Sequence, residues 1–241
     1  MYEQMETRWE GELPGTPEQI WDGITKHAGA WLWPIAYEPR VGGSERGLTS
    51  DGGTVTVWEP TRHFRTEASR PDGWFNVIDF RFDGNRLSLV HTCAMEASEL
   101  AVQHDACIQH TNFYYHSLGE YLRHFAGRPV TYVSADGPPE SAAARSFAAV
   151  RNELGIARDA ASGDRVTVDL PGAPGVEATI DYLTQEFLGL RTDDALYRFY
   201  GRDAFGWPVG IAHHLFGEDA DGSAAERAWG DWLAGLYHAR V

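Results

Sequence analysis

The strongest constraint on the fold is a pattern of strand, turn and helix that occurs twice along the chain. In the first copy, residues 8–13 (RWEGEL) alternate between larger apolar and charged side chains, which is typical of a strand with one buried face. Pro14 and Gly15 then end this strand. In the second copy, residues 130–134 predict a strand that leads through an Asp-Gly-Pro-Pro turn into a helix. The repetition predicts two units of related architecture.

Each turn is followed by residues that favour the start of a helix. Thr16 can cap a helix, Pro17 suits the first helical position, and Gln19 stands three residues after the cap, as in a capping box. We therefore expect the first helix to continue through Ile24. The corresponding helix of the second copy has an apolar face made of Phe147, Val150 and Leu154.

Both halves also end in a long amphipathic helix, and the residues in between predict strands. The expected helices cover residues 110–125 and 223–240, where apolar side chains gather near one face. The runs that are rich in β-formers and bounded by Pro, Gly and Asp turns are 52–60, 63–69, 74–84 and 85–92 in the first half, and 164–172, 176–184, 187–202 and 208–217 in the second.

This order of elements predicts an α+β fold with two units, each an antiparallel sheet curled around its last helix. We place the first domain at residues 1–128 and the second at residues 129–241. No low-complexity stretch separates them, so we expect no long flexible linker.

The charge balance narrows the range of partners. The chain has 35 Asp and Glu against 20 Lys and Arg, a formal net charge of -15, and such a field repels phosphate backbones and anionic lipid. We therefore expect no nucleic-acid partner and no membrane. No apolar run approaches the ~18 residues of a membrane helix, and two cysteines without further partners fit a reducing compartment, so we expect a cytoplasmic protein.

Several segments of the first half resemble the START-like (SRPBCC) superfamily with its helix-grip fold, and in particular the branch named after the activator of the heat-shock chaperone ATPase. The segment WLWPIAYEPRVGGSERG is similar to a tryptophan-containing segment of that family followed by Pro39, Arg40, Gly42 and Gly43. The resemblance continues through GGTVTVWEPTRHFRTEA, VIDFRFDGNRLSLVHT and the helix HSLGEYLRHF. It covers residues 6–126, and the second half resembles a diverged copy by its order of elements.

The resemblance implies a hydrophobic cavity between the sheet and the last helix, which different members use for lipids, polyketides, hormones or co-chaperone contacts. Aromatic side chains suit such a cavity, because they pack apolar ligands while Trp and Tyr keep a polar group. For any single aromatic residue, simple core packing is the competing interpretation. Our candidate ligand-binding residues are Trp31, Trp33, Trp58, Phe80, His110, Phe113, Tyr114 and Tyr121.

We therefore expect a protein that binds a small hydrophobic or aromatic molecule, in a carrier, sequestering or resistance-type role. One alternative is an enzyme of the cyclase, dehydratase or hydrolase kind, similar to the polyketide cyclases among the relatives, with a His or Glu of the cavity as acid or base. Another is a protein-binding adaptor similar to the co-chaperones, which would lack an open cavity. A chain with two copies supplies its own pair of units, so we expect a monomer with an intramolecular pseudo-dimer.

Recognisable catalytic motifs are absent from the sequence. It has no Gly-x-Ser-x-Gly elbow, phosphate loop or His-Glu-x-x-His helix. His104, Cys107 and His110 have a three-residue spacing that could put three metal ligands on one helical face, although the segment also fits the start of a helix. Because a fourth ligand is missing, we expect no stoichiometric metal and no other cofactor.

Other polar residues have a structural and a chemical interpretation. His116 and Glu120 are four residues apart and suit a local helical pair, or an acid and base beside a cavity. His213 and His214 alternate along a strand, so one of them should face the core. Arg40 suits an exposed salt bridge, or an anionic group at the mouth of the cavity.

We expect the ligand in the first half. That half holds six of the nine tryptophans, whereas the second half has Ile156, Ala157 and Arg158 after its first helix. We also expect a shorter connection from that helix to the next strand in the second half, with less room between helix and sheet.

Overall fold

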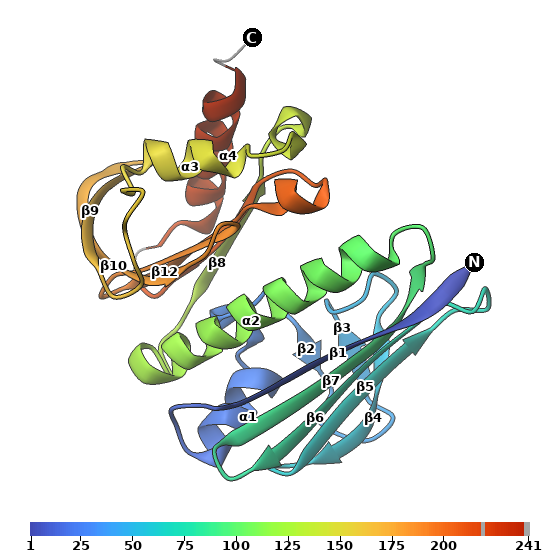
Figure 1. The fold of residues 1–241 in the computed structure, drawn as a ribbon. Helices are drawn as coiled ribbons and strands as arrows, with labels where there is room; N and C mark the ends of the chain where they lie inside the picture. Colours follow the sequence, from blue (N-terminus) through green and yellow to red (C-terminus); the bar gives the residue numbers. More distant parts are fainter. Residues whose placement is uncertain (218–219, 239–241) are drawn as a thin grey trace. The chain divides into compact units, whose positions relative to one another are not determined.

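The computed structural model describes residues 1–217 and 220–238. The chain forms two compact units, Met1–Ala126 and Gly127–Val241, each with its own sheet and helices (Figure 1). Both sheets are antiparallel, and the described residues contain four α-helices. The fold is therefore α+β, and its element order is consistent with two tandem helix-grip units.

The first unit opens as its sequence predicts. Strand β1 (Tyr2–Glu12) leads through the Pro14-Gly15 turn into helix α1 (Pro17–Thr25). Thr16 Oγ1 accepts a hydrogen bond from the Gln19 backbone N–H at 3.3 Å, and Gln19 Oε1 accepts one from the Thr16 N–H at 2.9 Å. These reciprocal bonds satisfy two N–H groups that a helix start leaves unpaired, and they confirm the predicted capping box.

The sheet of the first unit is a meander closed by its first strand. Its order is β1-β7-β6-β5-β4-β3-β2 in residues 1–126, all of which the structure describes. β1 pairs with β7 along its whole length, from Tyr2 opposite Glu96 to Glu12 opposite Arg86. The remaining strands are β2 (Ala36–Tyr37), β3 (Ser44–Arg46), β4 (Gly53–Glu59), β5 (His63–Ser69), β6 (Phe75–Asp83) and β7 (Arg86–Glu96).

Helix α2 (Leu100–His124) closes the first unit and lies along one face of its sheet (Figure 1). It begins ten residues before the predicted start at position 110, because residues 100–109 carry good helix formers and no helix breaker. Its buried side is made by Phe113, Leu118, Tyr121 and Leu122, with Phe125 directly after the last turn. The predicted apolar face of this helix is therefore confirmed.

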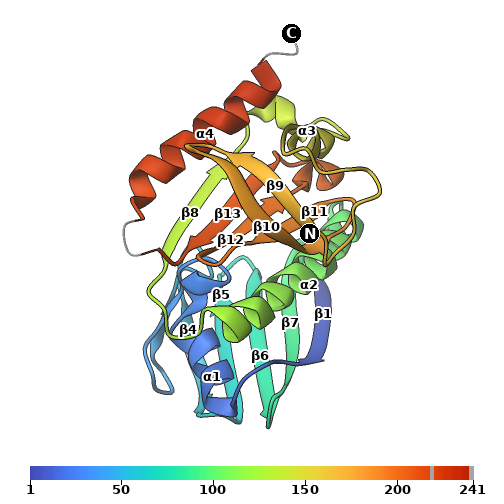
Figure 2. The same cartoon turned by 90° about the vertical axis from the view of Figure 1, so that its left-hand side faces the viewer.

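The second unit has the same general order of a first strand, a helix, further strands and a last helix, but among the described residues five strands lie between its helices where the first unit has six. Its sheet order among the described residues is β8-β13-β12-β11-β10-β9, so the first strand again lies beside the last. In Figure 2, helix α4 runs along β8 on one face of this sheet. The elements are β8 (Thr131–Asp136), α3 (Phe147–Glu153), β9 (Arg165–Leu170), β10 (Ala173–Leu183), β11 (Phe187–Arg191), β12 (Ala195–Tyr200), β13 (Gly210–Leu215) and α4 (Gly222–His238). Of the predicted last helix, residues 239–240 lie outside the described residues.

Two details of the second unit differ from expectation. The Asp-Gly-Pro-Pro turn leads first into a short 3-10 helix, Pro139–Ala142, and α3 starts five residues later. The connection from α3 to β9 covers residues 154–164, while residues 26–35 join α1 to β2, so the connection in the second unit is not the shorter one.

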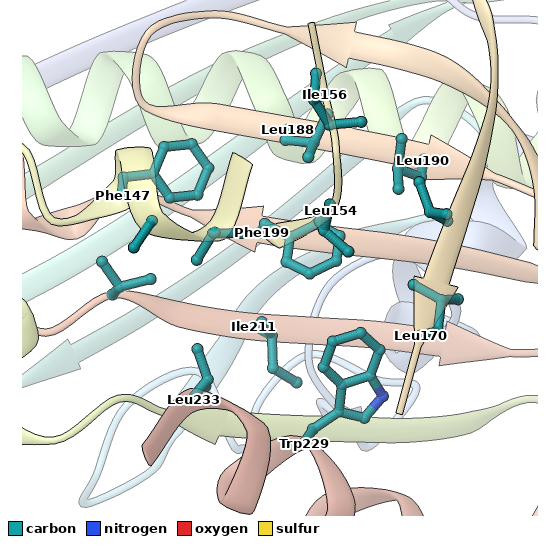
Figure 3. Packing of buried hydrophobic residues seen from close by; sticks show 14 of the residues in the cluster. Phe147, Leu154, Ile156, Leu170, Leu188, Leu190, Phe199, Ile211, Trp229 and Leu233 are labelled. Carbon is teal, nitrogen blue, oxygen red and sulfur yellow. The ribbon is translucent and has the colours of Figure 1, made fainter. Parts of the chain in front are cut away.

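The interior of the second unit is filled by apolar side chains from both helices and the sheet. Figure 3 shows Phe147 of α3 and Trp229 and Leu233 of α4 facing the sheet residues Phe199 and Ile211. All five are buried, and Leu233 and Phe199 are fully so. Burial of side chains this large is the main favourable contribution to folding of such a unit.

None of the helices in residues 1–217 and 220–238 combines the length and the apolar character needed to cross a bilayer.

Candidate functional site

An apolar cavity of about 150 Å³ lies in the first unit, between its sheet and α2. Aliphatic and aromatic side chains make most of its wall, and no Asp, Glu, Lys or Arg lines it among the described residues. It is lined by Ile24, Ala28, Trp31, Leu32, Trp33, Ile35, Tyr37, Leu48, Ile78, Phe80, Leu89, His91, Cys107, His110, Thr111, Tyr114 and Tyr115.

The segment after α1 supplies two tryptophans whose polar atoms are already paired with the backbone. The Trp31 indole N–H donates to the Gly23 carbonyl at 2.9 Å, and the Trp33 indole N–H donates to the Gly47 carbonyl at 2.7 Å. Gly47 has φ +99°, and a Cβ there would lie 2.6 Å from the Pro34 carbonyl oxygen, so this close approach requires glycine. With their N–H groups satisfied, the rings present hydrocarbon to the cavity.

Tyr115 of α2 fixes the aromatic wall on the helix side. Its ring stacks on Trp9 of β1 with the centroids 4.5 Å apart, and it contacts Trp31 at 5.6 Å and Phe80 at 6.5 Å. Tyr114, one residue earlier, meets Trp33 edge-on at 5.7 Å. These contacts hold the rings in place before any ligand arrives.

A hydrogen-bonded chain of three polar side chains reaches the cavity from the sheet. His91 Nε2 lies 2.7 Å from Asn76 Oδ1, and His91 Nδ1 lies 3.5 Å from Cys107 Sγ. Because the amide oxygen accepts from Nε2, neutral His91 carries its proton there and directs the lone pair of Nδ1 at the thiol. Burial lowers the pKa of His91 to about 4, so the ring is neutral at pH 7.

The remaining polar groups of the wall are hydrogen-bond donors or are tied to the backbone. Burial raises the pKa of Tyr115 well above its ordinary value, and burial together with the nearby Glu45 carboxylate raises the pKa of Tyr37, so both phenols keep their protons. His110 Nδ1 lies 2.8 Å from the Ala106 carbonyl oxygen and donates to it. The cavity is therefore apolar along its walls, with neutral polar groups at a few positions.

Five of the eight candidate binding residues line this cavity: Trp31, Trp33, Phe80, His110 and Tyr114. The other three lie elsewhere in the same unit. Trp58 packs edge-on against Trp21 and Phe64, with centroids 5.1 and 5.4 Å away. Phe113 and Tyr121 are 0% and 2% exposed. Aromatic content alone does not distinguish a residue that lines a cavity from one that packs in the core.

The possible metal ligands of α2 are each engaged separately. All three lie inside the helix, so the segment does not straddle a helix start. His104 Nε2 lies 3.1 Å from the Glu6 carbonyl oxygen, while Cys107 meets His91 and His110 bonds to Ala106. Across the part of the chain that the structure describes, no three His, Cys, Asp or Glu side chains are grouped to hold a metal ion.

The remaining singled-out residues have structural partners. Glu120 forms ion pairs with Arg123 and with His124, the latter at 3.6 Å. Arg40 makes the expected exposed salt bridge, with Glu38 at 2.8 Å.

His213 and His214 are both fully buried, although alternation predicts only one inward-facing residue. His213 Nδ1 accepts a hydrogen bond from the Arg198 backbone N–H at 3.0 Å, and its ring lies 4.3 Å from the Trp229 ring, edge-on. Burial lowers the pKa of His213 well below its ordinary value.

Sequence reasoning missed the chain of Asn76, His91 and Cys107 as a unit. Asn76, Ile78 and Phe80 alternate along β6, and Leu89, His91 and Cys93 alternate along β7. Strand alternation thus places Asn76 and His91 on the same inner face. The pairing of the two strands was the missing information, because it brings Asn76 opposite Cys93 and therefore diagonal to His91.

Comparisons with known proteins give distant structural neighbours. No family model and no curated protein matches the chain. DynU16, a protein from the dynemicin biosynthetic locus, is 15% identical over 97% of this chain and 97% of its own, with a TM-score of 0.39. A protein of unknown function from Staphylococcus aureus, SA2116, is 15% identical over 51% of this chain and 95% of its own (TM-score 0.43). The Aha1 dimer from Colwellia psychrerythraea is 16% identical over 49% and 96% (TM-score 0.36).

Proposed function

We propose that the first unit binds a small, mostly apolar molecule with a single six-membered ring in its cavity. The observation that carries this proposal is the apolar cavity of about 150 Å³ with preformed aromatic walls. Apolar surface that enters such a site leaves water, which is worth roughly 25 cal/mol per Å². A carrier or sequestering role follows most directly, because binding alone needs no reactive group.

The volume supports a compact ligand. Cavities of drug-sized ligands measure roughly 300–1,000 Å³, whereas a dry cavity of about 150 Å³ in another protein holds benzene. Tyr37, Thr111 and Tyr115 line the same space and each carries a hydroxyl group, so we expect one polar substituent on the ring to find a partner. A phenol is therefore a suitable first probe.

Catalysis on the bound molecule is the second candidate function, and the paired imidazole and thiol on the cavity wall favour it. A co-chaperone-like adaptor is less well supported, since we expect an adaptor of this fold to fill its cavity with side chains.

Calorimetric titration of the protein with phenol tests the binding proposal, with 1-naphthol as a ligand that is too large. We expect saturable binding of phenol to one site per chain and weaker binding of naphthol. Replacing Trp33 by Ala removes part of the wall, and we expect the Kd to rise about 5- to 150-fold, the equivalent of about 1–3 kcal/mol.

Trp58→Ala is the matched control, because Trp58 is also a partly exposed tryptophan of the first unit but lies outside the cavity lining. We expect it to lower stability and to change the Kd less than about twofold. The proposal is wrong if phenol does not bind, or if Trp33→Ala and the parent protein bind it equally well.

A further inference from the structure

Binding alone gives no role to the hydrogen-bonded chain from Asn76 through His91 to Cys107. The three residues come from β6, β7 and α2, and the distances along the chain are 2.7 and 3.5 Å. His91 and Cys107 both line the cavity in which a ligand would lie. A nucleophile that is activated by a base requires this arrangement: a thiol beside an imidazole, with a hydrogen-bond acceptor that orients the imidazole.

The proton positions favour removal of the thiol proton. Asn76 holds the His91 proton on Nε2, which leaves the lone pair of Nδ1 for the Cys107 S–H group. Burial disfavours an isolated imidazolium, but a thiolate formed at the same moment would lie within 3.5 Å of it. In a partly buried site the attraction between these opposite charges offsets much of that penalty, so the proton can pass from the thiol to the imidazole within this contact.

Cys93, the other cysteine of the chain, is less accessible than Cys107. Cys93 lies on the same inner face of β7 as His91, is 2% exposed, and has its pKa raised to about 12, first by burial and then by Cys107. Cys107 is only partly buried and lines the cavity. A reagent that enters the cavity therefore meets the Cys107 thiol.

We propose that Cys107 is a nucleophile, activated by His91 and positioned through Asn76, that adds to small cyclic enones bound in the cavity. This inference rests on the proposed ligand cavity for its substrate and on the three side chains for its chemistry. Cys107 and His91 are the catalytic residues in it, and Asn76 is a positioning residue.

The addition balances with the groups that are present. Cys107 Sγ forms a bond to the β-carbon of the enone while His91 Nδ1 takes the thiol proton, and the electrons of the C=C bond move to the carbonyl oxygen. His91 then returns the same proton to the α-carbon, which gives a saturated ketone joined to the protein through a thioether. No oxidant, leaving group or water is needed, and the reaction is reversible by the same steps. The protonated phenols of Tyr37 and Tyr115 are available in the cavity to donate to the enolate oxygen.

The pH dependence can be assigned to the pair because few other groups titrate beside it. The titratable side chains that share the cavity or the adjoining face of β7 are Tyr37, Cys93, His110, Tyr114 and Tyr115. None of them is a carboxylate or an always-charged cation, and the buried Glu45 carboxylate, which acts on Tyr37, lies outside the cavity lining.

Alkylation of Cys107 by iodoacetamide tests the activation without any ligand. In the parent protein, the proton transferred to His91 stays within the pair, so we expect the rate to change less than about threefold between about pH 5.5 and 7.5. In His91→Phe the thiol must ionise into solution, and below a thiol pKa of about 8.5 its rate should rise roughly 100-fold over the same range. Cys107→Ser should not be labelled, and His104→Gln, on the same helix but outside the cavity, should keep the parent profile.

Two variants at Asn76 separate positioning from folding. Asn76→Asp keeps an acceptor oxygen, so we expect the alkylation rate to stay nearly independent of pH over part of the range. The pH below which this rate falls should be higher than in the parent protein, because the carboxylate raises the pKa of His91. Asn76→Leu has a similar volume without an acceptor, and its profile should approach that of His91→Phe. If His91→Phe does not fold, this pair still decides the role of the imidazole.

Reaction with 2-cyclohexen-1-one tests the substrate class by intact mass. We expect one adduct per chain on Cys107, a rate that saturates with the concentration of the enone, and protection by phenol. A parent alkylation profile that rises with pH like that of a free thiol would overturn the proposal even if phenol binds. A flat alkylation profile without saturation and without protection by phenol would retain the activated thiol, but would reject both the cavity ligand and the enone chemistry.

Discussion

At the scale of single residues, the inner face of the first sheet combines satisfied and unsatisfied polar groups. Thr7 of β1 pairs with His91 of β7 and is 2% exposed. Its hydroxyl oxygen has no hydrogen-bond partner among the described residues. A buried hydroxyl without a partner costs roughly 1–3 kcal/mol relative to water. Thr25, in contrast, donates to the Trp21 carbonyl at 2.8 Å.

We therefore expect Thr7→Val to raise the free energy of unfolding by about 1 kcal/mol, because Val has the same shape and no polar atom to desolvate. Thr25→Val is the control and should lower it by about 0.5–1.5 kcal/mol, because a buried carbonyl loses its extra donor. Urea denaturation measures both changes. A loss of stability in Thr7→Val would mean that the Thr7 hydroxyl has a partner in solution.

Residue-scale chemistry also marks the limit of what the sequence could predict. Strand and helix positions followed from periodicity and from local signals such as Thr16 and Gln19, which act within a few residues of each other. Five aromatic or His positions of the cavity were identified from residue type. The joining of Asn76, His91 and Cys107 depends on strand register and on how α2 lies on the sheet, and neither is encoded within one short segment.

At the scale of elements, an ion pair that spans three strands of the second sheet requires a glycine on the middle strand. The Arg198 guanidinium on β12 reaches across β11 to Asp181 on β10, with Nη1 and Oδ2 3.0 Å apart and both side chains nearly inaccessible. Gly189 of β11 lies beneath this ion pair. A Cβ at Gly189 would lie 2.4 Å from Asp181 Oδ1 and 2.8 Å from Arg198 Nη1.

Gly189→Ala should accordingly separate the ion pair or push the strands apart, and we expect a loss of about 3–5 kcal/mol in the free energy of unfolding, as for other broken buried pairs. Gly230→Ala is the matched control. A Cβ at Gly230 in α4 meets no atom within 4 Å, and alanine favours the helix by about 0.8–1 kcal/mol, so this variant should be stabilised. Chemical denaturation of both proteins compares them directly, and a stable Gly189→Ala protein would contradict the steric argument.

At the scale of the whole molecule, the chain divides its buried apolar surface between two separate cores. The cavity belongs to residues of the first unit, while the cluster around Trp229 and Leu233 belongs to the second. Changes in the two places should therefore be nearly additive. We expect Trp229→Ala to lower the stability of the second unit by about 3–5 kcal/mol and to change the Kd for phenol less than about twofold.

The Kd of Trp229→Ala for phenol is measured by calorimetric titration, under conditions where circular dichroism shows that the variant is folded. A large change in Kd would show that the second core influences the cavity in the first unit.

The contact between His213 and Trp229 has a consequence for how the second unit could acquire a ligand. In each unit a histidine of the last strand meets the closing helix: His91 meets the small Cys107, whereas His213 meets an indole. The Trp229 side chain thus fills a space beside His213 in the core of the second unit, as a covalently attached ligand would. Removing that side chain leaves a vacancy with the shape of indole, and free indole added to Trp229→Ala should restore part of the lost stability by mass action. A single substitution would then convert the packed interior of the second unit into a cavity that binds a ligand.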